Sequence, residues 1–120
     1  MPGVFGRGGR EMGKNRLGEF EHRLLLAILR LGGEAYSVPL VLELEERTGR
    51  EVSQSSVFIV LQRLEKKGLL TSRLDEQTKP ETGRVRRYFC LTPEAIGQLR
   101  ESRNDLLALW EGISATLDEA

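Results

Sequence analysis

The apolar positions of the chain follow helical patterns before they change to a strand pattern. From residue 17 to residue 31, large apolar side chains recur every three or four residues, which is the spacing of one face of an α-helix. Gly32 and Gly33 end this pattern. Three further leucines widen the apolar stripe beyond one face: Leu25, Leu26 and Leu29. We therefore expect a helix that contacts its own core and also a second surface.

Two shorter helices are predicted after the first. Ser37 is expected to cap a helix that has Pro39 in its first turn and ends at Gly49. Ser53 is expected to cap a third helix, which runs from about Gln54 to Lys67 and ends before a glycine. The predicted core stripe of this third helix consists of Val57, Val60, Leu61 and Leu64.

Two strands and a last helix complete the predicted elements. Leu70–Asp75 and Arg84–Thr92 have the composition of strands, and the turn-forming residues between them predict a hairpin with a long loop. Thr92 is expected to cap a last helix that begins at Pro93. Its apolar positions repeat as a heptad seam with one polar break at Arg103. The seam consists of Ile96, Leu99, Arg103, Leu106, Trp110, Ile113 and Leu117.

The order of these elements predicts a mainly α (α+β) fold, namely a winged helix-turn-helix with a C-terminal dimerisation helix. The second and third helices are separated by the few residues typical of a helix-turn-helix, and the hairpin adds a wing. We expect a flexible basic arm at residues 1–16, a winged helix-turn-helix DNA-binding domain at residues 17–92 and the dimerisation helix at residues 93–120. In such a fold the third helix normally enters the major groove of DNA, and the wing contacts the neighbouring backbone.

The distribution of charge also favours a polyanionic partner. The chain has no net charge, yet residues 50–92 hold nine basic and five acidic side chains, and residues 93–120 hold two basic and six acidic ones. A basic middle segment of this kind favours nucleic acid. Cys90 is the only cysteine, which excludes an intramolecular disulfide and a cysteine zinc site. Because there is neither a membrane-length apolar run nor a secretory signal, we expect a cytoplasmic protein.

Three segments carry a resemblance to a known family. They are LGEFEHRLLLAILRLGGEAYSVPL at 17–40, TGREVSQSSVFIVLQRLEKKGLL at 48–70 and KPETGRVRRYFCLTPEA at 79–95. Together they resemble the short, single C-terminal helix branch of the PadR family of transcriptional regulators. The resemblance implies a homodimeric DNA-binding regulator, usually a repressor, whose dimer is formed by the last helix with help from the first. Two residues depart from the family pattern: Phe58 stands where the family often has tyrosine, and Ala95 where it usually has glycine.

The third helix carries the face that we expect to contact DNA. Opposite its core stripe, serine and glutamine side chains can hydrogen-bond base edges, and Ile59 can contact a thymine methyl group. The free N–H groups at the start of the helix favour a phosphate, and nearby basic side chains are natural phosphate contacts. The predicted DNA-binding residues are Tyr36, Ser53, Gln54, Ser55, Ser56, Phe58, Ile59, Gln62, Arg63, Lys66, Lys79, Arg84 and Arg86.

Structural roles stay open for several of these residues. Phe58 fits packing against the second helix or Tyr36 as well as it fits a contact with DNA. Tyr36 is similar to a tyrosine that contacts the DNA backbone in the family that the chain resembles. Arg63 fits an ion pair as well as a phosphate contact, and Lys66 also fits a plain solvated charge.

Two further basic residues, Lys67 and Arg87, are not expected to bind DNA. Lys67 is expected to be a solvated charge on the third helix. Arg87 faces away from Arg84 and Arg86 on the second strand, so we expect it to pair with an acidic side chain such as Glu65.

The predicted dimer surface combines the first and last helices. Its residues are Leu17, Phe20, Leu24, Ile96, Leu99, Leu106, Trp110, Ile113 and Leu117. Trp110 is expected in the dimer seam, with an alternative role as the aromatic wall of an effector pocket, since some members of the resembled family bind planar aromatic compounds. His22 is expected at the surface, and no catalytic residue, cofactor or metal site is predicted.

Two other functions stay open at this point. A winged-helix protein-interaction module would hold an acidic protein partner on the basic hairpin instead of DNA. A chain that is chiefly a small-molecule sensor would bind its ligand near Trp110. Salt-sensitive binding to duplex DNA distinguishes the first alternative, and quenching of tryptophan fluorescence tests the second.

Overall fold

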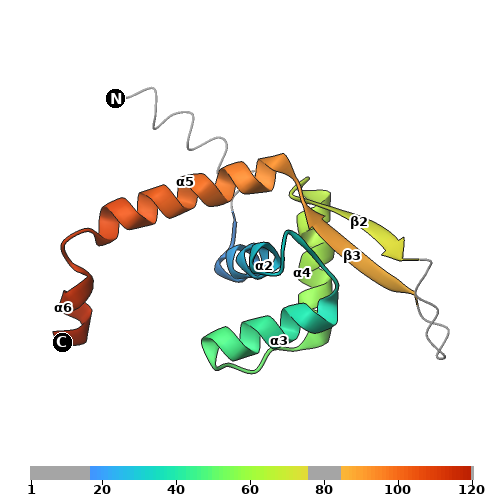
Figure 1. The fold of residues 1–120 in the computed structure, drawn as a ribbon, viewed down its shortest axis with the longest axis horizontal. Helices are drawn as coiled ribbons and strands as arrows, with labels where there is room; N and C mark the ends of the chain where they lie inside the picture. The colour runs from blue at the N-terminus through green and yellow to red at the C-terminus, as the bar shows by residue number, and fades with distance from the viewer. Residues whose placement is uncertain (1–16, 76–84, 120) are drawn as a thin grey trace.

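The computed structural model describes residues 17–75 and 85–119, and their arrangement confirms the predicted winged helix-turn-helix (Figure 1). The helices and strands are α2 (Glu19–Arg30), β1 (Glu34–Ala35), α3 (Ser37–Thr48), α4 (Gln54–Lys66), β2 (Leu70–Asp75), β3 (Arg86–Leu91), α5 (Pro93–Trp110) and α6 (Ser114–Glu119). Helices α2, α3 and α4 form the body of the molecule, with the sheet at one end, while α5 extends away from this body (Figure 1).

The sheet has three strands, of which the sequence predicted two. Strand β3 lies between β1 and β2 and is antiparallel to both. Ala35 of β1 and Ser72 of β2 are both paired with Phe89 of β3. The β2–β3 pairing is the predicted wing. Strand β1 was missed because a strand of two residues is too short to show an alternating pattern.

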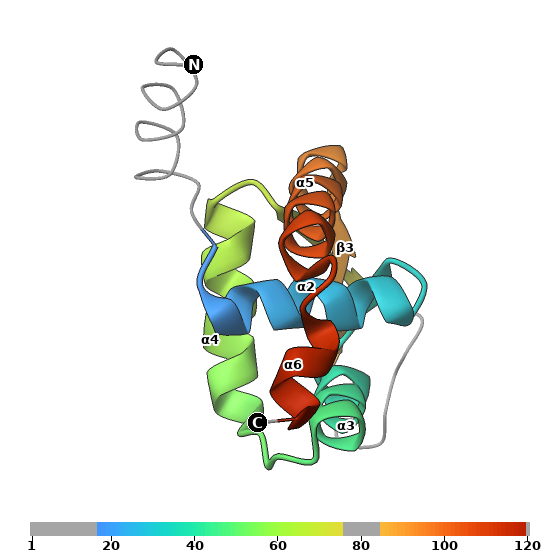
Figure 2. The same cartoon turned by 90° about the vertical axis from the view of Figure 1, so that its left-hand side faces the viewer.

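The core surrounds α2, which contacts α3, α4, α5 and β3 and crosses the middle of the body (Figure 2). The predicted stripe of α4 is buried, which confirms the helical spacing used to assign it. The largest fully buried side chains are Phe89, Leu24, Leu25, Ile28, Leu40, Leu61, Leu64, Leu69, Leu70 and Val57. Burial of each such side chain stabilises the fold by about 1.5–3 kcal/mol relative to exposure, before any conformational entropy is counted.

One charged residue, Glu21, is buried against this core. Its carboxylate accepts hydrogen bonds from the backbone N–H of Gly18 at 2.7 Å and from Nζ of Lys67 at 2.9 Å. Burial opposes ionisation of Glu21, but the hydrogen bonds from Gly18 and Lys67 outweigh it and hold the pKa of the carboxyl below its ordinary value. Lys67 is therefore part of a partly buried ion pair that joins the start of α2 to the end of α4, and its prediction as a solvated charge was wrong.

The helix ends follow the predicted glycine stops and two of the three predicted caps. The side chains of Ser53 and Thr92 accept hydrogen bonds from backbone N–H groups three residues later, as expected. Gly49 has a φ of 72°, in the left-handed region where glycine is favoured at the end of a helix. The cap of α3 differs from the prediction, because Tyr36 is the extended residue before the helix and Ser37 is the first helical residue.

The last helix is interrupted, which contradicts the prediction of one continuous heptad seam. Helix α5 ends at Trp110, and Gly112 follows with a φ of 82° that an α-helix cannot contain. The short helix α6 then continues in another direction (Figure 1). Ile113 and Leu117 therefore do not extend the stripe of α5, since the heptad spacing holds only within an unbroken helix.

Candidate nucleic-acid interface

The outer face of α4 is exposed and has the composition predicted for contact with base edges. Ser55, Ile59, Gln62 and Lys66 are all exposed, whereas the opposite stripe of this helix is buried. Ile59 leaves 56% of its surface open to solvent. The face therefore combines hydrogen-bonding groups, an apolar group and a positive charge, as a surface that contacts the major groove requires.

The start of α4 is joined to the start of α3 by polar contacts. Ser53 caps the helix and its hydroxyl also lies 2.9 Å from the hydroxyl of Ser55. Nε2 of Gln54 donates to the hydroxyl of Ser37 at 3.3 Å. The Gln54–Ser37 contact joins the first turn of α4 to the first turn of α3, while the serine contacts lie within the start of α4.

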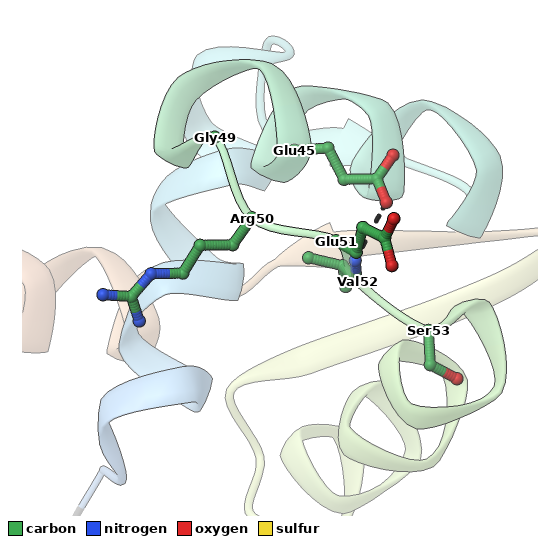
Figure 3. Close-up of a pocket in the computed structure, with 6 residues that line it drawn as sticks. All are labelled: Glu45, Gly49, Arg50, Glu51, Val52 and Ser53. Atoms are coloured by element: carbon green, nitrogen blue, oxygen red, sulfur yellow. Dashed lines mark hydrogen bonds between the residues drawn. The ribbon is translucent and has the colours of Figure 1, made fainter.

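A shallow pocket lies in the turn between these two helices. It is lined by Glu45 and by residues 49–53 (Figure 3). Glu45 accepts a hydrogen bond from the backbone N–H of Val52 at 2.9 Å, which fixes the turn. In Figure 3 the carboxylates of Glu45 and Glu51 point to one side and Arg50 points away from them. Two carboxylates on one side disfavour a phosphate at this pocket. We therefore assign the pocket to the structure of the turn.

Phe58 lies on the flank of α4 and contacts the core. Its ring meets the ring of Phe89 edge to face, with 6.2 Å between the ring centres and 79° between the planes. The side chain is still 37% exposed. Phe58 thus has a packing role, and its aromatic partner is Phe89 of β3 rather than Tyr36. The exposed part of the Phe58 side chain can contact a binding partner.

The basic residues of α4 have different environments. Arg63 and Lys66 are exposed on the last turns of the helix. The positive charge of Arg63 also contributes, as the smallest cause, to the lowered pKa of Glu21. Helix α4 therefore has two exposed cations, Arg63 and Lys66, while Lys67 is held by Glu21.

The outer face of the wing forms a stack of aromatic and basic side chains. The guanidinium of Arg86 lies over the ring of Tyr36, with 4.6 Å from its central carbon to the ring centre. The rings of Tyr36 and Tyr88 meet edge to face at 5.3 Å. Arg73 covers the ring of Tyr88 at 4.8 Å and forms two hydrogen bonds with the carboxylate of Glu34. Arg86 and Tyr36, which were predicted separately from sequence, are brought together here.

Three other predictions about the wing have different outcomes. Lys79 and Arg84 lie outside the described residues, so their contacts with DNA stay predictions. Arg87 faces the opposite side, as expected, and donates to the hydroxyl of Ser72 at 3.0 Å. That hydroxyl in turn donates to Glu65, so Arg87 reaches the predicted acidic side chain through a serine.

The predicted dimer residues divide into exposed and buried sets. Leu106, Trp110, Ile113 and Leu117 are exposed, and Leu17, Phe20 and Ile96 are partly buried. Leu24 and Leu99 are 0% and 5% exposed, because they pack inside the core of their own chain. They therefore offer little or no surface to a second copy, and their role as dimer contacts stays a prediction. Four leucines that the prediction omitted are exposed on α2 and α5: Leu26, Leu29, Leu107 and Leu109.

Other kinds of site find no support in the described part of the chain. Within residues 17–75 and 85–119, no three histidine, cysteine or acidic side chains are placed to hold a metal ion. No helix in the same ranges is long and apolar enough to cross a membrane. The distinctive chemistry of the described surface is therefore the face of α4 together with the stack on the wing.

Comparison with known proteins agrees with this geometry. A model of the transcriptional regulator PadR-like family matches residues 25–101. The chain belongs to this family. Its members are transcriptional regulators and not enzymes, so the chain is a PadR-like DNA-binding regulator. A comparison with curated proteins gave no match.

Solved structures share the fold. A PadR family regulator from Eggerthella lenta is 27% identical, with a TM-score of 0.60 over 82% of this chain and 87% of that one. A PadR family regulator from Clostridium difficile is 20% identical, with a TM-score of 0.65 over 82% of this chain and 98% of that one. A winged-helix DNA-binding protein from STIV is 12% identical, with a TM-score of 0.62 over 76% of this chain and 90% of that one.

Proposed function

We propose that this PadR-like regulator is a homodimeric, cytoplasmic repressor that binds a pseudo-palindromic operator. The observations that carry the proposal are the exposed outer face of α4 and the Arg86–Tyr36 stack, with the start of α4 linked by the Gln54–Ser37 contact to the residue that follows Tyr36. This surface joins hydrogen-bonding side chains for base edges to cations for phosphates. We retain the proposed division into an arm at 1–16, a DNA-binding domain at 17–92 and a dimerisation region at 93–120.

Each part of this surface has a separate task in the proposed complex. Helix α4 enters the major groove, where Ser55 and Gln62 hydrogen-bond base edges and Ile59 contacts a thymine methyl group. Arg63 and Lys66 bind phosphates beside the groove, and Arg86 binds a phosphate from the wing. The remaining predicted contacts, which include Lys79 and Arg84, belong to the same proposal.

The dimer is proposed from the apolar surface of the C-terminal helices. Leu106, Leu107, Leu109 and Trp110 on α5 are between 42% and 71% exposed. Ile113 and Leu117, beyond the turn at Gly112, are also exposed and apolar, although they do not extend the stripe of α5. A series of large exposed apolar side chains on a helix that extends away from its own core is typical of a surface that a second copy covers. Two copies would place two α4 helices on successive half-sites of a symmetric operator.

We also propose that Trp110 contacts an aromatic effector. The side chain lies at the end of α5, and 42% of its surface is exposed in the single chain. In the proposed dimer it lies at the seam, where an aromatic ligand could stack on the indole ring. Quenching of its fluorescence by a planar aromatic compound, together with release of the operator, is the expected result.

Selection from a pool of random duplexes tests the function directly. The full-length chain is incubated with the pool, and the bound duplexes are recovered by mobility shift and sequenced. We expect an inverted repeat whose half-sites are about 10–11 base pairs apart, centre to centre, with nanomolar affinity that falls steeply as salt increases. Enrichment of no inverted repeat would contradict the proposed symmetric complex. Binding of an acidic protein but not of any duplex would favour the interaction-module alternative.

A further inference from the structure

The stack on the wing is a series of side-chain contacts that links the three strands to the residue before α3. It begins at Glu34 on β1, passes through Arg73 on β2 and Tyr88 on β3, and continues to Tyr36 before α3. It ends at Arg86 on β3, over the face of the Tyr36 ring. The order is acid, cation, ring, ring, cation, so each contact joins groups of complementary electrostatic character.

The two arginines of the stack are held in different ways. Arg73 donates from Nε and Nη2 to the two carboxylate oxygens of Glu34, at 3.0 Å and 2.9 Å. This pair neutralises the charge of Arg73, and the hydrogen bond from Arg73 is the main cause of the lowered pKa of Glu34. Arg86 instead rests on a neutral ring, which fixes its plane without neutralising its charge. A stacked guanidinium keeps its N–H groups at its edge, where they can donate to a phosphate.

We propose that Tyr88 and Arg73 are positioning residues, which hold Tyr36 and thereby fix the Arg86 guanidinium as a phosphate-binding group. Glu34 anchors the far end of the stack. The inference rests on the DNA-binding role of Arg86 proposed above. It adds that residues without contact to DNA set the affinity of the wing, because an arginine that is already ordered loses less conformational entropy when it binds.

The position of Tyr36 explains why the stack extends beyond the strands to the start of α3. Tyr36 precedes Ser37, whose hydroxyl accepts the hydrogen bond from Gln54 at the start of α4. The same tyrosine therefore lies beside the groove-facing helix and under the wing arginine. Holding its ring with Tyr88 and Arg73 keeps the wing cation at a constant distance from the first turn of α4. If the ring of Tyr36 were mobile, the Arg86 side chain would be mobile too.

A pair of uncharged substitutions tests the inference on the full-length protein. Binding to a fluorescein-labelled, mixed-sequence duplex DNA is measured by anisotropy at several salt concentrations. Tyr88→Leu removes the ring and is expected to weaken binding roughly two- to fivefold. It should also lower the slope of log affinity against log salt concentration by about one, and we expect the same result for Arg86→Gln. Tyr88→Phe keeps the ring and is the matched control, with affinity within twofold of the wild type.

The decisive measurement combines the substitutions. If Tyr88 acts through Arg86, then Tyr88→Leu causes no further loss when Arg86→Gln is already present. If the leucine variant is not folded, Arg73→Lys gives the same test without a change of charge. The lysine loses the paired hydrogen bonds and the planar contact with the ring, so a loss of about twofold is expected.

Three results separate the failure of this inference from the failure of the proposed function. Equal losses for Tyr88→Phe and Tyr88→Leu would assign the effect to the hydroxyl and overturn the positioning role. Additive losses for Tyr88→Leu and Arg86→Gln would also overturn it, because the two residues would then act independently. A wild-type chain that binds no duplex at all would overturn the proposed function together with this inference.

Discussion

The partly buried pair between Glu21 and Lys67 permits a quantitative test of how α2 and α4 are held together. We consider Glu21→Gln, which removes the charge but keeps the size of the side chain. The carboxylate is 7% exposed and accepts bonds from Gly18 and Lys67 at 2.7–2.9 Å. The variant retains an acceptor for Gly18 but replaces the carboxylate beside the ammonium of Lys67, which is only 23% exposed, with a neutral amide. We expect the free energy of unfolding to fall by about 2 kcal/mol.

Thermal unfolding followed by circular dichroism measures this effect at a fixed protein concentration. A loss of about 2 kcal/mol lowers Tm by roughly 6–10 °C in a chain of this size. The matched control is Glu19→Gln, on the same helix, where the carboxylate is 78% exposed and pairs with Arg23 at the surface. The control is expected to shift Tm by no more than about 2 °C, because exposed ion pairs contribute little. Equal Tm values for the two variants would refute the assignment of Glu21 as a structural charge.

The pH dependence follows from the lowered pKa of Glu21. A carboxyl whose pKa is lower in the folded state contributes stability above its unfolded pKa, close to 4.5, and loses it as pH falls through the folded pKa. The difference in stability between the wild type and Glu21→Gln is therefore expected to be constant near neutral pH and to shrink below about pH 4.5. A difference that grows on acidification would contradict the ion-pair account.

Three further predictions concern the two proposed surfaces. Ile59→Ser is expected to reduce discrimination between thymine and uracil in the selected operator, measured by competition with duplexes that lack the 5-methyl group, because the methyl contact is lost. Lys66→Ala should weaken binding to all duplexes and lower the salt slope by about one, whereas Gln62→Ala should relax preference at one base position, as measured by repeating the selection. Leu106→Glu is expected to yield a monomer in sedimentation analysis, while Leu42→Glu, at a position on α3 that is also exposed, should leave the oligomeric state unchanged.

The fold could be predicted from sequence where a local signal was sufficient. The caps at Ser53 and Thr92 and the stop at Gly49 lie where their side chains and backbone angles require them. The strand β1 and the buried role of Glu21 could not be predicted, because both depend on partners far away in the chain. Glu21 is a charged residue within an apolar stripe, and only its contact with Lys67, 46 residues later, makes its burial favourable.

The sequence predicted which residues belong to the candidate site better than it predicted how those residues contact one another. Helical spacing alone placed Ile59 and Gln62 opposite the buried stripe, and the structure exposes both. The stack between Tyr36 and Arg86 was not foreseen, since β3 and the start of α3 are brought together only by the sheet. The continuous heptad seam was wrong because the pattern ignored Gly112, and the left-handed backbone at that glycine stops the helix.

The central claim is that the outer face of α4 and the stacked wing together bind DNA. Titration of the isotope-labelled full-length protein with the selected operator duplex, followed by amide chemical shifts, tests it most directly. We predict the largest changes at Ser55, Ile59 and Gln62 on α4 and at Arg86 on β3, with small changes along α5. Changes concentrated on α5 and α6, with the amides of α4 unaffected, would contradict the account.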